Sequence, residues 1–137
     1  MGKIIKVEEV EKLVADLKNK KIVLAGGCFD ILHIGHITFL EKAKASGDIL
    51  ILLLESDAAI KKLKGEKRPI NSQENRAKVL SSVEFVDFIV SLPKPFETAD
   101  YQNLVTQISP NIIAVTEGDP NLEEKKSQAK KTGGEVK

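Results

Sequence analysis

The sequence predicts an α/β domain with a Rossmann-like parallel sheet flanked by helices. Short apolar runs alternate with amphipathic stretches along the whole chain, which is the pattern of βαβ units. The longest apolar run, Ile49 to Leu54, has the uninterrupted apolar character of a central strand that is covered on both faces. A glycine pair, Gly26 and Gly27, ends an earlier run where such folds place a ligand-binding loop.

The first half of the chain contains a leading helix, two strands and a further helix in our prediction. Apolar residues at helical spacing predict a leading N-terminal helix over Val7 to Leu17. Ile22 to Ala25 is predicted as a short buried strand, and a loop then leads into a helix from about His36 to Ser46. After the central strand, Lys61 to Ser72 is predicted as a basic loop, because it is polar, contains a glycine and a proline, and lacks a core-facing period.

The second half continues the alternation. The predicted elements are a helix over Gln73 to Val83, a third strand over Phe85 to Val90, a helix over Tyr101 to Ile108, a fourth strand over Ile112 to Val115, and a last helix over Leu122 to Lys131. Gly133 and Gly134, followed by Glu135 to Lys137, predict a turn into another strand. With 137 residues and 42% apolar content, the chain fits one domain over residues 1–137.

Composition argues against several classes of partner. The net charge of +1 provides no global field for nucleic acid or an anionic membrane. No apolar run is long enough to span a bilayer, and the charged residues near the start do not fit a signal peptide. The single cysteine, Cys28, cannot form an internal disulfide. We therefore expect a cytoplasmic protein without nucleic-acid or membrane partners.

The segment His33-Ile34-Gly35-His36 lies between a glycine-rich strand end and a predicted helix start. Free backbone N–H groups and the positive end of the helix dipole favour an anion there, and phosphate is the expected ligand. Two imidazoles can donate hydrogen bonds to phosphoryl oxygens whose charge rises in a transition state. Phosphoryl and nucleotidyl transfer depend mainly on such positioning and charge neutralisation.

Other interpretations of these residues stay open at this point. The two histidines could be a surface pair without a role, or Cys28, Asp30, His33 and His36 could hold a metal, although no structural zinc spacing matches. The basic cluster of Lys62, Lys64, Lys67 and Arg68 is either a solvated face or, beside a phosphate loop, part of the site. Cys28 fits a small packing residue better than a nucleophile. The sequence contains neither a P-loop motif nor a Gly-x-Gly-x-x-Gly run, which argues against a P-loop kinase and against an NAD enzyme.

The eleven residues from Gly26 to His36, GGCFDILHIGH, resemble the signature of the cytidylyltransferase-like nucleotidyltransferase superfamily. The resemblance covers roughly residues 20–119, since further family motifs follow in order: Ser56-Asp57, Leu63-Lys64-Gly65, Arg68-Pro69-Ile70, Arg76 and Val86-Asp87. The chain is most similar to the adenylyltransferase domain of bifunctional heptose-phosphate enzymes, which also begins with a helix. Glycerol-3-phosphate cytidylyltransferases and archaeal FAD synthetases are more distant.

The resemblance implies roles for individual residues. His33 and His36 would contact the nucleotide phosphates, and Lys64 would neutralise the α-phosphate, so these three are the catalytic candidates. The nucleotide-binding candidates are Gly26, Gly27, Cys28, Phe29, Gly35, Lys67 and Arg76. The candidates near the acceptor or a metal are Asp30, Asp57, Asp87 and Asp119. Asp119 belongs to Thr116-Glu117-Gly118-Asp119, which matches the family's Gly-Gly-Asp motif only after a one-residue insertion. No structural metal is expected.

The activity implied is transfer of a nucleoside monophosphate from an NTP, with ATP favoured, to a phosphorylated sugar or similar small molecule, with release of pyrophosphate. Mg²⁺ would come with the NTP, and a homodimer is implied by the resemblance alone. Cytidylyl transfer to a polyol phosphate such as glycerol 3-phosphate is one alternative, and a catalytically weak nucleotide-binding module is another. The family carries a Ser/Thr-rich segment near its C-terminus, and we expect a longer chain to continue into it after Lys137.

Overall fold

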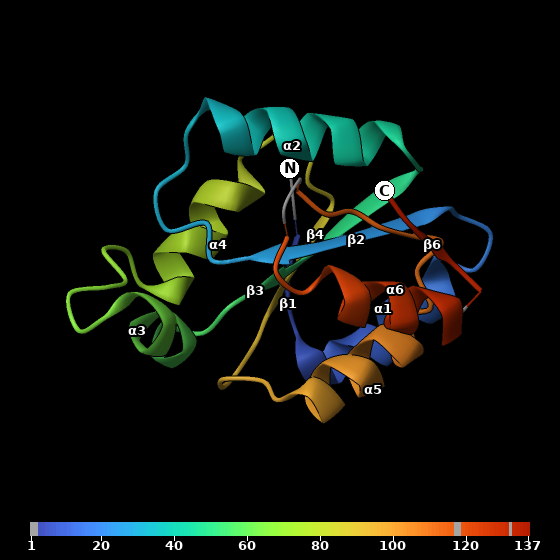
Figure 1. Ribbon diagram of the computed structural model, residues 1–137. Coiled ribbons are helices and arrows are strands. Elements are labelled where there is room, and N and C mark those ends of the chain that lie inside the picture. The colour runs from blue at the N-terminus through green and yellow to red at the C-terminus, as the bar shows by residue number, and fades with distance from the viewer. Residues whose placement is uncertain (1–2, 117–118, 132) are drawn as a thin grey trace.

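The computed structural model describes residues 3–116, 119–131 and 133–137 of the chain. Within these residues, six strands form one parallel sheet in the order β1-β4-β3-β2-β5-β6 (Figure 1). The strands are β1 (Lys3–Lys6), β2 (Ile22–Gly27), β3 (Ile49–Leu54), β4 (Phe88–Ser91), β5 (Ile112–Ile113) and β6 (Glu135–Val136). The predicted Rossmann-like parallel sheet is therefore confirmed.

Helices cover both faces of this sheet (Figure 1). Helices α2 (Ile34–Ala45) and α4 (Gln73–Ser81) lie on one face. The other face carries α1 (Val10–Asp16), which follows the 3-10 turn η1 (Val7–Glu9), together with α5 (Thr98–Ile108) and α6 (Leu122–Lys131). The leading N-terminal helix is thus confirmed, as a 3-10 turn that continues into an α-helix.

The central strand β3 shows why the sheet is buried on both faces. Its side chains alternate between two apolar clusters, so that Leu50, Leu52 and Leu54 pack with the α2 and α4 face. Ile51 and Leu53 pack with the face that α1, α5 and α6 cover. All five are at most 5% exposed, and burying each contributes roughly 1.5–3 kcal/mol. The continuous apolar run follows from this two-sided burial.

Two elements differ from the prediction. Strand β1 was not predicted, because only Ile5 of its four residues is buried and the flanking lysines give no strand signal. Lysines on an edge strand of this kind discourage pairing with another chain. The predicted loop Lys61 to Ser72 is also wrong in its first part, because α3 (Asp57–Lys64) extends through it. The Ser56 hydroxyl caps this helix by accepting a hydrogen bond from the Ala59 N–H at 3.1 Å.

Other boundaries shift by a few residues. The third predicted strand begins later, at Phe88, and the fourth is shorter, at Ile112–Ile113. Strand β6 confirms the predicted strand after the glycine pair, and it pairs in parallel with β5. Along the described residues, none of the helices is both long enough and apolar enough to cross a membrane.

The topology selects one place for a ligand. The chain proceeds from β2 to β3 and β4 on one side, and then returns to the other side of β2 to form β5. The strand order therefore reverses between β2 and β5, and open α/β sheets bind ligands at the carboxyl ends of the strands at such a switch point. The loop after β2, which leads to His33 and to His36 in the first turn of α2, starts at this point.

Candidate active site

A cavity of about 410 Å³ lies at the switch point, between the end of β2 and the segment after β5. Most of the residues predicted for the site line it: Gly26, Gly27, Cys28, Phe29, His33, Gly35, His36 and Asp119. The structure thus brings together residues that are up to about ninety positions apart in the sequence. Thr116 and Lys125 also line this cavity.

His33 and His36 begin helix α2 in a reciprocal arrangement. His33 is the N-cap residue, and its Nδ1 accepts a hydrogen bond from the Gly35 N–H at 3.0 Å. The Nδ1 of His36, in the first turn, accepts one from the His33 N–H at 3.2 Å. Since both Nδ1 atoms are acceptors, the neutral rings carry their protons on Nε2. Both rings therefore bring an N–H donor to the cavity that they line, beside the positive end of the helix.

The cavity favours neutral imidazole at His36. Partial burial, the neighbouring His33 and the charge of Lys64 all lower the pKa of His36, in that order of size. Burial raises the pKa of the Cys28 thiol, and the opposing influence of Lys64 is smaller. Cys28 is therefore a protonated thiol at neutral pH, which fits packing rather than nucleophilic chemistry. Lys64, the last residue of α3, is close enough to influence both groups, although it does not line the cavity.

The backbone from the end of β2 into the first turn of α2 allows close packing against the two histidine rings, at Phe29 and at Gly35. Phe29 is buried and has a φ of 47°, a left-handed conformation that non-glycine residues seldom adopt. Its ring packs 5.6 Å from the ring of His36. A side chain at Gly35 would place its Cβ 2.7 Å from Cε1 of His33, so glycine is required there for the observed position of the His33 ring.

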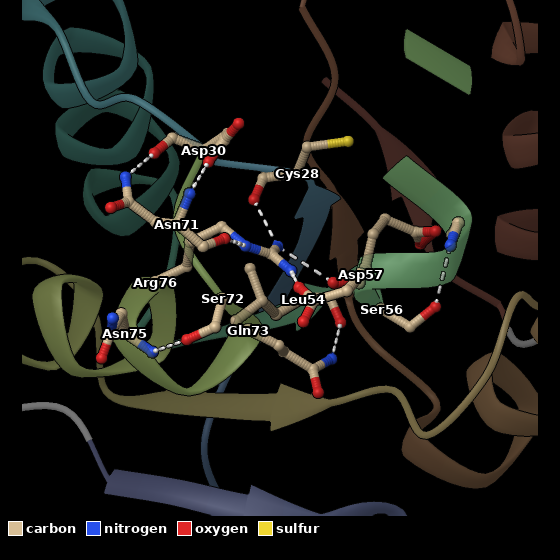
Figure 2. Close-up of polar contacts among 12 residues, drawn as sticks. Cys28, Asp30, Leu54, Ser56, Asp57, Asn71, Ser72, Gln73, Asn75 and Arg76 are labelled. Atoms are coloured by element: carbon tan, nitrogen blue, oxygen red, sulfur yellow. Dashed lines mark hydrogen bonds and ion pairs between the residues drawn. The ribbon is translucent and has the colours of Figure 1, made fainter. Parts of the chain in front are cut away.

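Arg76, predicted to bind nucleotide, is instead completely buried beneath the site (Figure 2). Its guanidinium Nη1 donates to the carbonyl oxygens of Cys28 at 2.8 Å and Glu55 at 3.0 Å. Its Nε donates to the carbonyl oxygen of Asn71, and its Nη2 donates to a carboxylate oxygen of Asp57 at 2.7 Å. Arg76 therefore joins the ends of β2 and β3 to the start of α4, and it does not line the cavity.

Asp30, predicted near the acceptor or a metal, also has a structural set of partners (Figure 2). Its carboxylate accepts hydrogen bonds from Arg68 Nε at 2.7 Å and from the backbone N–H groups of Ile70 and Asn71, each at 2.8 Å. Burial alone would raise the pKa of Asp30, but these two N–H groups and the Arg68 guanidinium outweigh it and lower the pKa to about 2. Asp30 thus fastens the loop of residues 65–72 to the loop after β2.

This arrangement argues against the metal alternative, because the Asp30 carboxylate faces these donors and is not grouped with the histidines. Among residues 3–116, 119–131 and 133–137, no group of three or more histidine, cysteine, aspartate or glutamate side chains could hold a metal ion.

The remaining predicted residues lie in different places. Asp119 lines the cavity and accepts a hydrogen bond from Lys125 Nζ at 2.6 Å, while Glu117 and Gly118 of the same motif lie outside the described residues. Lys67 is exposed in the loop of residues 65–72.

Asp87 lies at the amino end of β4, where its carboxylate accepts hydrogen bonds from Lys44 Nζ and the Leu50 N–H. The prediction that places Asp87 near the acceptor is corrected, because the amino ends of parallel strands face away from the site.

The structure also brings in residues that the sequence did not single out. A second cavity of about 250 Å³ adjoins the first and shares Gly26, Gly27, Cys28, Ala114 and Lys125 with it. Glu55 and Tyr101 line this second cavity. Glu55 directly follows the central strand, so its position at the carboxyl end of β3 could have marked it as a candidate. Tyr101, on α5, gave no such signal.

Comparisons with known proteins agree with this geometry. The model of the family described as cytidylyltransferase-like matches residues 24–130. The bifunctional protein HldE of Aliarcobacter butzleri is 51% identical over 108 residues, which cover 77% of this chain and 22% of that protein. The bifunctional protein HldE of Helicobacter pylori is 47% identical over 108 residues, covering 79% and 23%. The chain therefore spans about a fifth of the length of these relatives.

Solved structures share the fold. The lipopolysaccharide core biosynthesis protein from Thermoplasma volcanium superposes with a TM-score of 0.70 at 29% identity, over 87% of this chain and 93% of that one. Pantoate-beta-alanine ligase from Francisella tularensis superposes with a TM-score of 0.76, over 100% of this chain and 66% of that one. At 17% identity the second likeness concerns the fold alone. From the family match and the arrangement of both histidines at the switch point, the chain belongs to the cytidylyltransferase-like family.

Proposed function

We propose that this chain is a nucleotidyltransferase that moves a nucleoside monophosphate from an NTP, with ATP favoured, to a phosphorylated sugar. The observation that carries the proposal is the pair of imidazoles at the N-terminus of α2, which line the switch-point cavity with their Nε2 atoms available as donors. The similarity to the bifunctional HldE proteins, over the part of them that this chain spans, supports the same function.

In this proposal the triphosphate lies against the first turn of α2. An oxygen of the acceptor's phosphate attacks the α-phosphorus in line, a new P–O bond forms, and the bond to the bridging oxygen of the β-phosphate breaks. Pyrophosphate leaves with the electron pair of that bond, so no covalent enzyme intermediate is needed. His33 and His36 donate from Nε2 to the phosphoryl oxygens as their charge rises. Lys64 neutralises the α-phosphate from the end of α3.

Other residues of the predicted set have supporting roles in this scheme. Gly26, Gly27 and Gly35 allow the phosphates close to the backbone. Phe29 packs against His36 and holds its ring. Arg76 and Asp30 fix the loops around the cavity through the contacts described above. Asp119, bound to Lys125, lies at the side of the cavity where ribose or acceptor hydroxyls would bind.

We propose Mg²⁺ as the accompanying ion. Since the described residues contain no cluster of three acidic, cysteine or histidine ligands, the oxygens of the triphosphate would supply most of its coordination, as is usual for Mg²⁺. When bound, the ion supplies positive charge to the leaving pyrophosphate. The homodimer and the cytoplasmic location stay predictions.

The test is pyrophosphate release by the purified chain with ATP or CTP and a panel of acceptors: heptose 1-phosphate, mannose 1-phosphate and glycerol 3-phosphate. Release that needs ATP and a sugar phosphate supports the proposal. Preference for CTP and glycerol 3-phosphate would favour cytidylyl transfer instead. If no acceptor gives release while ATP still binds, the chain is a nucleotide-binding module and the proposed catalysis is wrong.

A further inference from the structure

The second cavity is lined mostly by apolar residues, and of its polar residues only Lys125 also lines the nucleotide cavity. It lies on the face of the sheet that α5 and α6 cover, whereas α2 and its histidines belong to the other face (Figure 1). Its polar residues come from the end of β3, from α5 and from α6 or the turn before it: Glu55, Tyr101, Asn121, Glu124, Lys125 and Gln128. The two cavities meet at Gly26 to Cys28, the end of β2.

Glu55 lines this cavity and is held in place by backbone hydrogen bonds. Its backbone N–H donates to the carbonyl oxygen of Gly27 at 3.1 Å, and its own carbonyl oxygen accepts from buried Arg76. The Tyr101 hydroxyl lies 2.5 Å and 2.9 Å from the two carboxylate oxygens. A hydroxyl has one proton to donate, while an ionised carboxylate can accept about four hydrogen bonds. Glu55 is therefore a positioned acceptor with unused capacity.

We propose that the second cavity binds the polyol part of the phosphorylated acceptor, and that the Glu55 carboxylate, oriented by Tyr101, accepts hydrogen bonds from its hydroxyl groups. This inference rests on the proposed function, because it assigns the acceptor to a place beside the nucleotide. Nothing in the sequence singled out either residue. Glu55 is the specificity-determining residue in this scheme, and Tyr101 is a positioning residue that acts through it.

The position of the second cavity favours binding of the acceptor substrate over binding of the nucleobase. For in-line attack, the acceptor's phosphate must approach the α-phosphorus from the side opposite the leaving pyrophosphate. In the proposed function the histidines bind the triphosphate in the first cavity, which leaves the adjoining second cavity, at the shared β2 end, for the acceptor. Lys125 lines both cavities, and its ammonium, which donates one hydrogen bond to Asp119, has further N–H donors where the acceptor's phosphate would pass between them.

The hydrogen-bonding character of Glu55 also favours a polyol over a nucleobase in the second cavity. A carboxylate only accepts hydrogen bonds, so it suits a ligand that presents several donors close together, as neighbouring sugar hydroxyls do. The edge of a nucleobase mixes donors with acceptors. A carboxylate with its two oxygens held by one tyrosine is therefore better matched to a polyol than to a base.

The experiment compares wild type with Glu55→Gln and Tyr101→Phe in the full 137-residue chain. Each protein is titrated by calorimetry with heptose 1-phosphate, mannose 1-phosphate and glycerol 3-phosphate, in the presence of a non-hydrolysable ATP analogue. Where turnover occurs, KM is measured separately for acceptor and for ATP. Glu84→Gln is the matched control, because Glu84 is exposed between α4 and β4 at the far end of the sheet.

We expect Glu55→Gln to weaken binding of the sugar phosphate, or raise its KM, about tenfold or more, since hydrogen bonds to a charged group are the stronger kind. Tyr101→Phe should give a smaller loss of the same kind, because the carboxylate stays but loses its orientation. Affinity for the ATP analogue should stay unchanged in both variants and in the control.

The inference is overturned if Glu55→Gln leaves acceptor affinity unchanged, if it weakens the ATP analogue instead, or if wild type binds the analogue but none of the polyol phosphates. Failure of the proposed function has a different signature: wild type then releases no pyrophosphate from ATP with any of the acceptors, whatever Glu55→Gln does to acceptor affinity. Thermal melting of each variant, matched to wild type, shows that a lost affinity does not come from unfolding.

Discussion

The centroids of the His33 and His36 imidazole rings lie 4.0 Å apart, and each ring accepts a hydrogen bond from a backbone N–H at Nδ1. One backbone donor comes from Gly35 and the other from His33 itself, so the turn that starts α2 and the two side chains fix one another. Orientation of both rings is therefore settled before any ligand arrives. Preorganised donors of this kind avoid reorganisation during the reaction, which is why they lower the barrier.

Replacing His36 should impair the transition state more than nucleotide binding. We expect His36→Ala to lower kcat/KM by about 10² or more, on the order of 2.7–4 kcal/mol, as for a lost oxyanion donor. His36→Gln, whose amide can place an N–H near Nε2, should retain part of the rate. Steady-state pyrophosphate release gives kcat/KM, and calorimetry gives ATP affinity. Unchanged turnover in His36→Ala would make this histidine structural.

Gly35→Ala should disturb the site without unfolding the domain. The added Cβ would lie 2.7 Å from Cε1 of His33, and the ring can move outward because His33 is exposed. Since alanine favours helix, we expect the melting temperature to stay within a few degrees of wild type. Turnover should fall at least about tenfold, because the displaced ring loses the Gly35 N–H that orients it. Wild-type turnover in this variant would contradict the role given to His33.

Sequence patterns predicted the sheet well because β2, β3 and their helices carry strong, local signals. The run Ile49 to Leu54 and the spacing around Leu40 indicate burial directly. Strand β1 escaped prediction because a single buried residue, Ile5, leaves no period to detect. Helix α3 escaped prediction because its last turn, Lys61 to Lys64, is exposed and its mostly polar composition is that of a loop.

The site was predictable where it is local and not where it depends on tertiary contacts. GGCFDILHIGH is contiguous, and seven of its eleven residues line one cavity. The partners of Arg76 and Asp30 are backbone groups of loops brought together by folding, and a sequence does not show which carbonyl or N–H a side chain will meet. The pair of Glu55 and Tyr101 joins the end of β3 to α5 in the same way.

Asp30 should make stability depend on pH in the acid range. Its folded pKa, about 2, is below the ordinary aspartate pKa of 3.8, so its contribution to stability is fully present above about pH 3.8 and is lost as the pH falls toward 2. Asp30→Asn should therefore lower the melting temperature at pH 6 and change it little near pH 2. Thermal melts of both proteins between pH 2 and pH 6 test this. A constant difference across that range would mean that the carboxylate charge is irrelevant.

Arg76 should matter more for the fold of the site than for direct contact with nucleotide. Arg76→Met keeps the length of the side chain but leaves the carbonyl oxygens of Cys28, Glu55 and Asn71 without their donor. Removing one partner from such a buried charged network costs about 3–5 kcal/mol, which urea unfolding would detect as an earlier midpoint. The matched control is Asp57→Asn, since Asp57 is 49% exposed and its ion pair should contribute under about 1 kcal/mol. Equal losses in the two variants would show that the ion pair, and not the bonds to the strand ends, holds Arg76 in place.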